Sequence, residues 1–293
     1  MPLSNLLLSI PSPPVKLSVL LTGIQTDPLS FVALALEIAS ILLYVWGARA
    51  LNARGRQWPR LRTVSFFAGV AVVFIATGSG LAAYDDSVFT LHVVQHLMLM
   101  NLAPIFIALS APVTLLLQAS NRTVQTKAIK FLHSKVIALL TFPVFAWLLN
   151  YSTMYIYFLT PIYQLSIEHP LFHDYTHLHF LIAGLIFWTT LIGIDPIRWK
   201  MHYGAKLAYL FAGIPFGTFL GIALTSVRTS ISPAHTVADI HAGGAVLWVF
   251  GEVFTVGAIA IIFFQWARHE ERIAIRADRD LDRQVINGRD GGG

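Results

Sequence analysis

Two pairs of histidines are the residues whose type and spacing point most directly to chemistry. His92 and His96 are four positions apart, and so are His173 and His177. On a helix, residues four apart lie on one face, about one turn from each other. Each pair therefore offers two imidazoles to the same neighbour. Because imidazole binds copper, zinc, iron and nickel, two facing pairs predict a metal site between two helices.

A third segment adds Asp239 and His241, which precede two small residues that permit close helix approach. We include both among the candidate metal ligands, and we expect Asp174 to orient one imidazole of the second pair. His169 and His179 are predicted to be incidental or accessory. Glu37 and Glu252 fall inside apolar segments, where each is either a buried pair partner or part of a proton or cation path. Further candidates are Arg228 as a counter-ion and Met98 and Met100 as core residues.

The composition places these residues in a bilayer and limits the available ligands. Of the 293 residues 56% are hydrophobic and 12% are charged, and the mean hydropathy is +0.66, a balance that ordinary soluble domains do not show. The chain has no cysteine, which excludes disulfides, iron–sulfur clusters and thiolate metal sites. Metal chemistry must therefore depend on histidine, with Met, Asp and Glu as its helpers.

A spanning helix needs about 20 mostly apolar residues, and seven such runs occur. The sequence therefore predicts an all-α, polytopic membrane helix bundle with seven transmembrane helices, near residues 29–48, 64–83, 88–118, 136–158, 171–194, 204–227 and 240–267. Pro104 and Pro112 are expected to kink the long third span, because proline removes a backbone hydrogen bond and clashes with the preceding turn. Asn101 is near enough to satisfy the carbonyl freed at Met100.

The basic residues give this bundle an orientation. With seven spans, 18 of the 20 Lys and Arg residues fall on one side, and only Lys16 and Arg228 fall on the other. The positive-inside rule then predicts an outer N-terminus and a cytoplasmic C-terminus. Because the basic residues lie in loops, nucleic acid is not a predicted partner. Eight of the 11 histidines are then expected at the outer face.

Three regions follow from this topology. Residues 1–28 form an extracytoplasmic segment with an interfacial helix around residues 15–23, and they lack the cationic start of a cleaved signal peptide. Residues 29–267 form the seven-helix transmembrane domain. Residues 268–293 form a charged cytoplasmic tail that we expect to be frayed, with no core of its own.

Several segments also resemble a known family, in matching order and spacing. They are LHVVQHLMLMNLAPIFIALSAPVTLLLQ, HDYTHLHFLIAGLIFWTTLIGIDP and ADIHAGGAVLWVFGE. The chain resembles the membrane-embedded CtaG family of cytochrome c oxidase assembly factors, caa-type branch, and its actinobacterial members most closely. The resemblance covers about residues 15 to 275. It departs where the family usually carries Asp-Gln and this chain has Asp239-Ile240-His241, so His241 is a candidate to replace the glutamine.

The resemblance implies a non-enzymatic, multi-pass protein of the bacterial plasma membrane that helps to assemble the copper-containing oxidase. Its cofactor would be copper, handled on the outer side. Its partners would be cytochrome c oxidase subunits or another copper chaperone, with membrane lipid around the helices.

Two other functions stay open at this stage. Facing histidines of two helices also ligate a b-type haem, which would make the chain a membrane redox protein. A metal ion or proton transporter would instead need a continuous polar path to the cytoplasm, and the inner half of the predicted bundle offers few polar groups.

Overall fold

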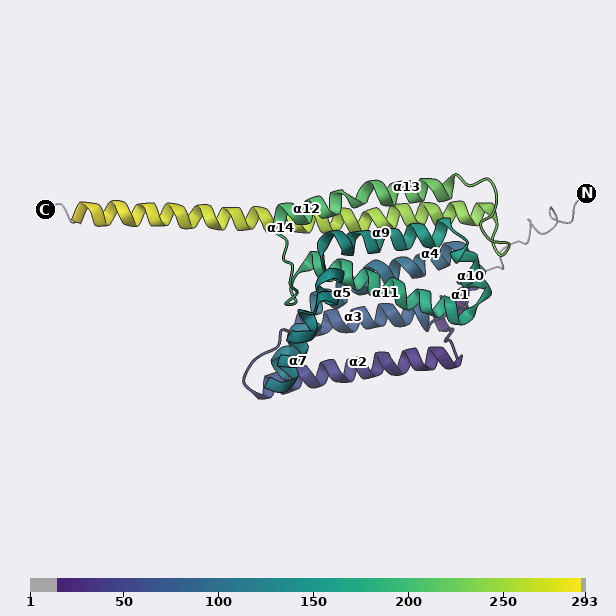
Figure 1. Cartoon of the computed structure of the whole chain (residues 1–293), viewed down its shortest axis with the longest axis horizontal. Coiled ribbons are helices and arrows are strands. Elements are labelled where there is room, and N and C mark those ends of the chain that lie inside the picture. Colours follow the sequence, from purple (N-terminus) through teal and green to yellow (C-terminus); the bar gives the residue numbers. More distant parts are fainter. Residues whose placement is uncertain (1–14, 291–293) are drawn as a thin grey trace, which may run out of the picture.

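The computed structural model describes residues 15–290 and shows a helical bundle whose long helices run along a common axis (Figure 1). Within that range there is no strand, only an isolated bridge between Ile24 and Ser79. The all-α prediction is therefore confirmed. The helices are α1 (Leu17–Thr22), α2 (Pro28–Ala53), α3 (Arg60–Thr77), α4 (Phe89–Leu97), π-helix η3 (Met98–Leu102), α5 (Ala103–Ser110), α6 (Pro112–Ala119), α7 (Arg122–Leu132), α8 (Lys135–Leu140), α9 (Pro143–Leu159), α10 (Ile162–Glu168), α11 (Pro170–Ile192), α12 (Tyr203–Phe211), α13 (Gly213–Thr225) and α14 (Val237–Asp290).

Six helical segments of the described chain are long and apolar enough to cross a membrane. They correspond to every predicted span except the fourth, near residues 136–158, which the structure divides into α8 and α9. The division follows from Pro143 at the start of α9. A residue before proline is pushed out of the helical region, and Phe142 accordingly has φ −65° and ψ 124°.

The long third segment is interrupted in two places near its prolines. Before Pro104, the chain forms the π-helix η3, in which the Ala103 amide donates to the carbonyl of Met98. Before Pro112, Ala111 adopts a left-handed conformation with φ 51°. The interruptions predicted from Pro104 and Pro112 are thus present, the first as a π-turn and the second as a break between α5 and α6.

Helix α11 lies directly against the π-helix. A side-chain carbon at Gly184 would be 2.2 Å from the carbonyl oxygen of Met100, so only glycine permits this approach. Small residues allow the backbones of membrane helices to come close in this way. The contact fixes α11 beside the segment that carries His92 and His96.

Helix α14 continues without a break for 54 residues and projects far beyond the bundle (Figure 1). The prediction of a frayed tail after residue 267 is therefore wrong as far as Asp290. Charged residues of good helix propensity, here Arg and Glu, allow a solvated helix to continue without a packed face. The short helix expected around residues 15–23 is present as α1, whereas residues 1–14 lie outside the described chain.

Candidate metal centre

The two histidine pairs meet between α4 and α11. The ring centroids of His92 and His173 are 5.2 Å apart with nearly parallel planes, and those of His96 and His177 are 5.4 Å apart. Within each helix, the paired rings are 4.4 Å apart. All four side chains are buried. The structure therefore brings together the four imidazoles that the sequence analysis pairs by spacing.

The ring nitrogens converge as metal ligands do. One donor atom from each of His92, His96 and His173 lies within 4.8 Å of the others, and the same holds for Asp85, His173 and His177. Nε2 of His96 is 2.7 Å from Nε2 of His92. Two nitrogens bound to one ion at about 2.0–2.1 Å each lie roughly 3 Å apart, so small ring rotations convert this hydrogen bond into shared ligation.

Three of these imidazoles also have a buried nitrogen without a protein partner. The atoms are Nδ1 of His96, Nε2 of His173 and Nε2 of His177. A buried polar atom left unpaired costs about 1–3 kcal/mol, and native structures keep such atoms rare. Neutral imidazole nitrogens with free lone pairs are what a metal ion requires.

Asp86 orients His173. Its carboxylate lies 3.0 Å from Nδ1 of His173, which turns Nε2 of that ring towards the other histidines. From the sequence, this role is expected of Asp174, for which the described chain shows no hydrogen bond to a histidine. Asp174 directly follows His173 in sequence, but Asp86 approaches from the loop before α4, a contact that spacing along α11 does not reveal.

His92 is held by both of its ring nitrogens. Nδ1 is 3.2 Å from the carbonyl oxygen of Asp85, and Nε2 is 3.1 Å from the hydroxyl of Tyr157 on α9. That hydroxyl also pairs with Ser166 at 2.8 Å. Tyr157 was missed by the sequence analysis because a tyrosine in an apolar span carries no distinguishing pattern.

Aromatic rings pack around the histidines. The Phe180 ring is tilted against the His96 ring at 4.0 Å between centroids, and Phe158 and Tyr163 lie edge-on to His92 at 6.4 and 5.1 Å. Dry surroundings strengthen electrostatic interactions and disfavour charge. Burial accordingly raises the pKa of the Asp85 carboxyl, just outside α4, to about 6.

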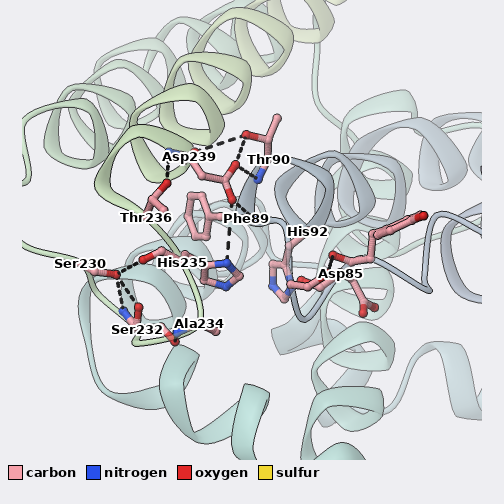
Figure 2. Close-up of polar contacts among 12 residues, drawn as sticks. Asp85, Phe89, Thr90, His92, Ser230, Ser232, Ala234, His235, Thr236 and Asp239 are labelled. Atoms are coloured by element: carbon pink, nitrogen blue, oxygen red, sulfur yellow. Dashed lines mark hydrogen bonds and ion pairs between the residues drawn. The ribbon is translucent and has the colours of Figure 1, made fainter. Parts of the chain in front are cut away.

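Asp239 lies at the centre of a different contact, which fastens α14 to α4 (Figure 2). Its carboxylate accepts from the amide of Phe89 at 2.6 Å and from the amide and hydroxyl of Thr90 at 3.1 and 2.7 Å. These amides begin α4 and have no partner inside the helix, so Asp239 caps α4 from another helix. The structure places this carboxylate outside the two groups of converging ligand atoms.

His235, His241 and His179 contact other groups, and Nδ1 of His235 is also buried without a hydrogen-bond partner. Nε2 of His241 is 2.9 Å from the carbonyl of Val227. Nε2 of His235 is 2.5 Å from the Tyr163 hydroxyl, and its Nδ1 is 3.9 Å from Asp239. Burial lowers the pKa of His235, which lies in the loop before α14. His179 pairs with the Thr153 hydroxyl at 3.0 Å.

Comparisons with known proteins cover most of this chain. A family model described as cytochrome c oxidase caa3 assembly factor matches residues 42–269, a range that includes both histidine pairs. Uncharacterized proteins of Mycobacterium bovis and Mycobacterium tuberculosis are each 31% identical over 257 residues, and one of Mycobacterium leprae is 32% identical. Each alignment covers 82% of this chain but 39% of the relative, so the chain spans less than half the length of these relatives. No solved structure gives a significant match.

Proposed function

The chain belongs to the family of cytochrome c oxidase caa3 assembly factors, and from this membership we propose that it binds copper through His92, His96, His173 and His177. In this proposal the four histidines hold copper as cargo near the outer face of the plasma membrane. The copper passes to a subunit of the oxidase or to another copper chaperone. The chain itself performs no catalysis.

The observation that carries the proposal is the convergence of four buried imidazoles, three of which have a nitrogen without a protein partner. A structural cluster would pair these nitrogens with hydroxyls or carbonyls, as Nε2 of His241 is paired with the carbonyl of Val227. Copper(II) has the highest affinity of the common divalent ions for a nitrogen site. The absence of cysteine leaves imidazole as the strongest ligand type in the chain.

The hydrogen bond between His92 and His96 gives the centre a way to release its cargo. When the two Nε2 atoms share a proton at 2.7 Å, the rings satisfy each other in the absence of metal. Copper and this hydrogen bond compete for the same lone pairs, so protonation favours release and deprotonation favours loading. A carrier needs such a balance, because a site that binds too tightly does not deliver.

The predicted topology determines on which side of the membrane the site lies. Helices α1 and α10 lie at one end of the bundle, whereas α7 and the extension of α14 lie at the other (Figure 1). The basic residues of α7 and α14 favour a cytoplasmic position for their end. With α8 and α9 together as the remaining crossing, the chain has seven spans and an outer N-terminus. Copper would then be handled outside the cell, among membrane lipid.

The b-type haem alternative has no comparable support. Two axial imidazoles must receive a porphyrin between them, and that ring extends well beyond both ligands. Here the facing rings of His92 and His173 are stacked at 5.2 Å, and Tyr157 and Phe180 surround the cluster closely. The packing matches a single ion better than a macrocycle.

Copper content of the purified protein tests the proposal. Each of His92→Ala, His96→Ala, His173→Ala and His177→Ala should weaken copper binding at the four-histidine site at least tenfold, because an imidazole ligand is lost. His133→Ala, an exposed histidine at the end of α7, is the matched control and should retain copper. Elemental analysis with a visible spectrum gives the readout. A Soret band with stoichiometric iron, or equal losses in His133→Ala, would contradict the proposal.

Oxidase assembly in membranes gives a second measurement of the same proposal. A weakened site is less loaded at low copper, and mass action restores loading when copper rises. Oxygen uptake by a His92→Ala strain should therefore recover along a copper series. Flat activity at wild-type protein abundance would count against copper supply.

A further inference from the structure

A small cavity lined by polar and apolar side chains lies about one turn deeper in the bundle than the four histidines. It has a volume of about 60 Å³ and is lined by α9, α13, α14 and η3, and α9, α13 and α14 run side by side there (Figure 1). A cavity needs at least about 10–15 Å³ to hold one water, so this space is large enough for a small ion. The lining includes Asn101, Met100, Asn150, Met154 and Glu252.

Glu252 brings a carboxylate to this cavity without a matching cation. It lies about 22 Å along α14 from the first residue, at 1.5 Å per residue, and therefore deep in the span. Its one side-chain hydrogen bond comes from Thr218 at 3.3 Å. Among the residues that the structure describes, no Lys or Arg forms an ion pair with it. A carboxylate at this depth marks a functional site unless a partner neutralises it.

Asn150 supplies an independent observation. Its side chain is 6% exposed, it lines the cavity, and its Oδ1 atom is buried without a hydrogen-bond partner. A buried amide oxygen without a partner is energetically costly, and a bound cation or a hydrogen-bond donor would satisfy it. The cavity thus combines one negative charge with a free carbonyl dipole.

Two thioethers complete this set of ligand types. Met100 and Met154 both line the cavity and are buried. Methionine sulfur is a soft ligand that selects copper(I), whereas Mg²⁺ and Ca²⁺ prefer an all-oxygen site. One carboxylate also balances the single charge of copper(I). Soft sulfur, one anion and a neutral oxygen favour this ion over a divalent one.

Two glycines on α13 leave space for polar side chains at this cavity. A side-chain carbon at Gly217 would lie 3.0 Å from Oε1 of Glu252, and one at Gly213 would lie 1.9 Å from the hydroxyl of Tyr151. The two glycines are one turn apart on α13, so its bare backbone leaves room for the heads of both side chains. Larger residues would displace them from the cavity.

We propose that this cavity is a second copper site, which binds copper(I) through Met100, Met154 and Glu252, with Asn150 as an oxygen ligand. The inference rests on the proposed function for the identity of its cargo. Met100 follows His96 by one turn, and Met154 precedes Tyr157 by one turn. The second site therefore continues the line of ligands from the outer histidines into the membrane, along the same two elements.

The test measures copper(I) binding by the purified full chain under anaerobic conditions, in competition with bicinchoninate. The wild type should bind about two ions per chain, and X-ray absorption should show copper–sulfur scattering. Met154→Leu and Glu252→Gln, which keep side-chain size, should each reduce binding to about one ion, and Met154→Leu should remove most of the sulfur signal. Met98→Leu is the matched control, because Met98 lies in η3 without lining the cavity.

Two outcomes separate this inference from the proposed function. A single copper bound through nitrogen alone, lost in His96→Ala, would overturn the second site and leave the histidine site standing. A His96→Ala protein that keeps its sulfur-ligated copper supports the second site directly. Sulfur scattering that persists unchanged in Met100→Leu and Met154→Leu would also overturn it. Thermal unfolding of each variant shows that losses of metal are not losses of fold.

Discussion

His173 illustrates how a single contact can orient a buried imidazole for the proposed copper site. A neutral imidazole has one nitrogen that donates and one that accepts, and the partner of the first decides the direction of the second. Asp86 takes Nδ1 of His173 at 3.0 Å, so the lone pair of Nε2 points inward. The Asp85 carbonyl takes Nδ1 of His92 in the same manner. Both acceptors come from one loop.

Removal of Asp86 should weaken copper binding without removing a ligand. Such supporting contacts usually change metal affinity by about 10–100-fold, and because the Asp86 side chain is 59% exposed, we expect about tenfold for Asp86→Ala. Asp174→Ala is the matched control, an acidic residue beside His173 without a hydrogen bond to it, and should change affinity little. Competition titration of copper measures both. A larger loss in Asp174→Ala would restore the assignment made from the sequence.

At the scale of helices, Asp239 shows how α14 and α4 are joined. The first amides of a helix carry partial positive charge and lack internal partners. Asp239 meets two of them and the hydroxyl of Thr90 in one contact. Gly243 allows the two helices to approach, since a side-chain carbon there would lie 2.4 Å from the ring of Phe89.

Asp239→Ala should therefore destabilise the protein, by about 1–3 kcal/mol, because it leaves buried donors unpaired. Asp239→Asn keeps an acceptor oxygen and should recover much of that loss. Thermal unfolding in detergent gives the stabilities, and copper content is measured on the same samples. If Asp239 is a metal ligand, as its sequence position suggests, then Asp239→Asn will lose copper while keeping its unfolding temperature.

The sequence predicts the helical class, six of its seven expected spans and the pairing of the histidines, because lipid exposure and helical spacing are local properties. It does not predict which acidic residue meets which helix. Asp239 and Phe89 are 150 positions apart, and Asp86 reaches His173 from another loop. Hydropathy registers only that a residue is polar, so a cap and a ligand look alike until the helices are placed beside one another.

In the whole molecule, the basic residues are concentrated at one end of the bundle. The basic residues between α2 and α3, in α7 and in the extension of α14 gather towards one end, away from α1 and α10 (Figure 1). An end of a membrane bundle that carries most of the positive charge usually faces the cytoplasm.

Reporter fusions test this orientation. A reporter joined after residue 275 should be active in the cytoplasm, and one joined before residue 28 should be active outside. The physical reason is the 18-to-2 division of basic residues between the two sides. An external signal from both fusions would require an odd change in the number of crossings and would contradict the seven-span topology.

The π-helix η3 makes the direction of the first histidine pair depend on the number of residues in this segment. A π-turn holds one residue more than the α-turn it replaces, and one residue corresponds to about 100° of rotation about a helix axis. The segment before η3 is therefore out of phase with α5 by that angle. Loss of one residue between His96 and Pro104 would restore an even helix and turn the first histidine pair away from the second. The length of this short stretch, more than the chemistry of its side chains, thus keeps the four imidazoles in register.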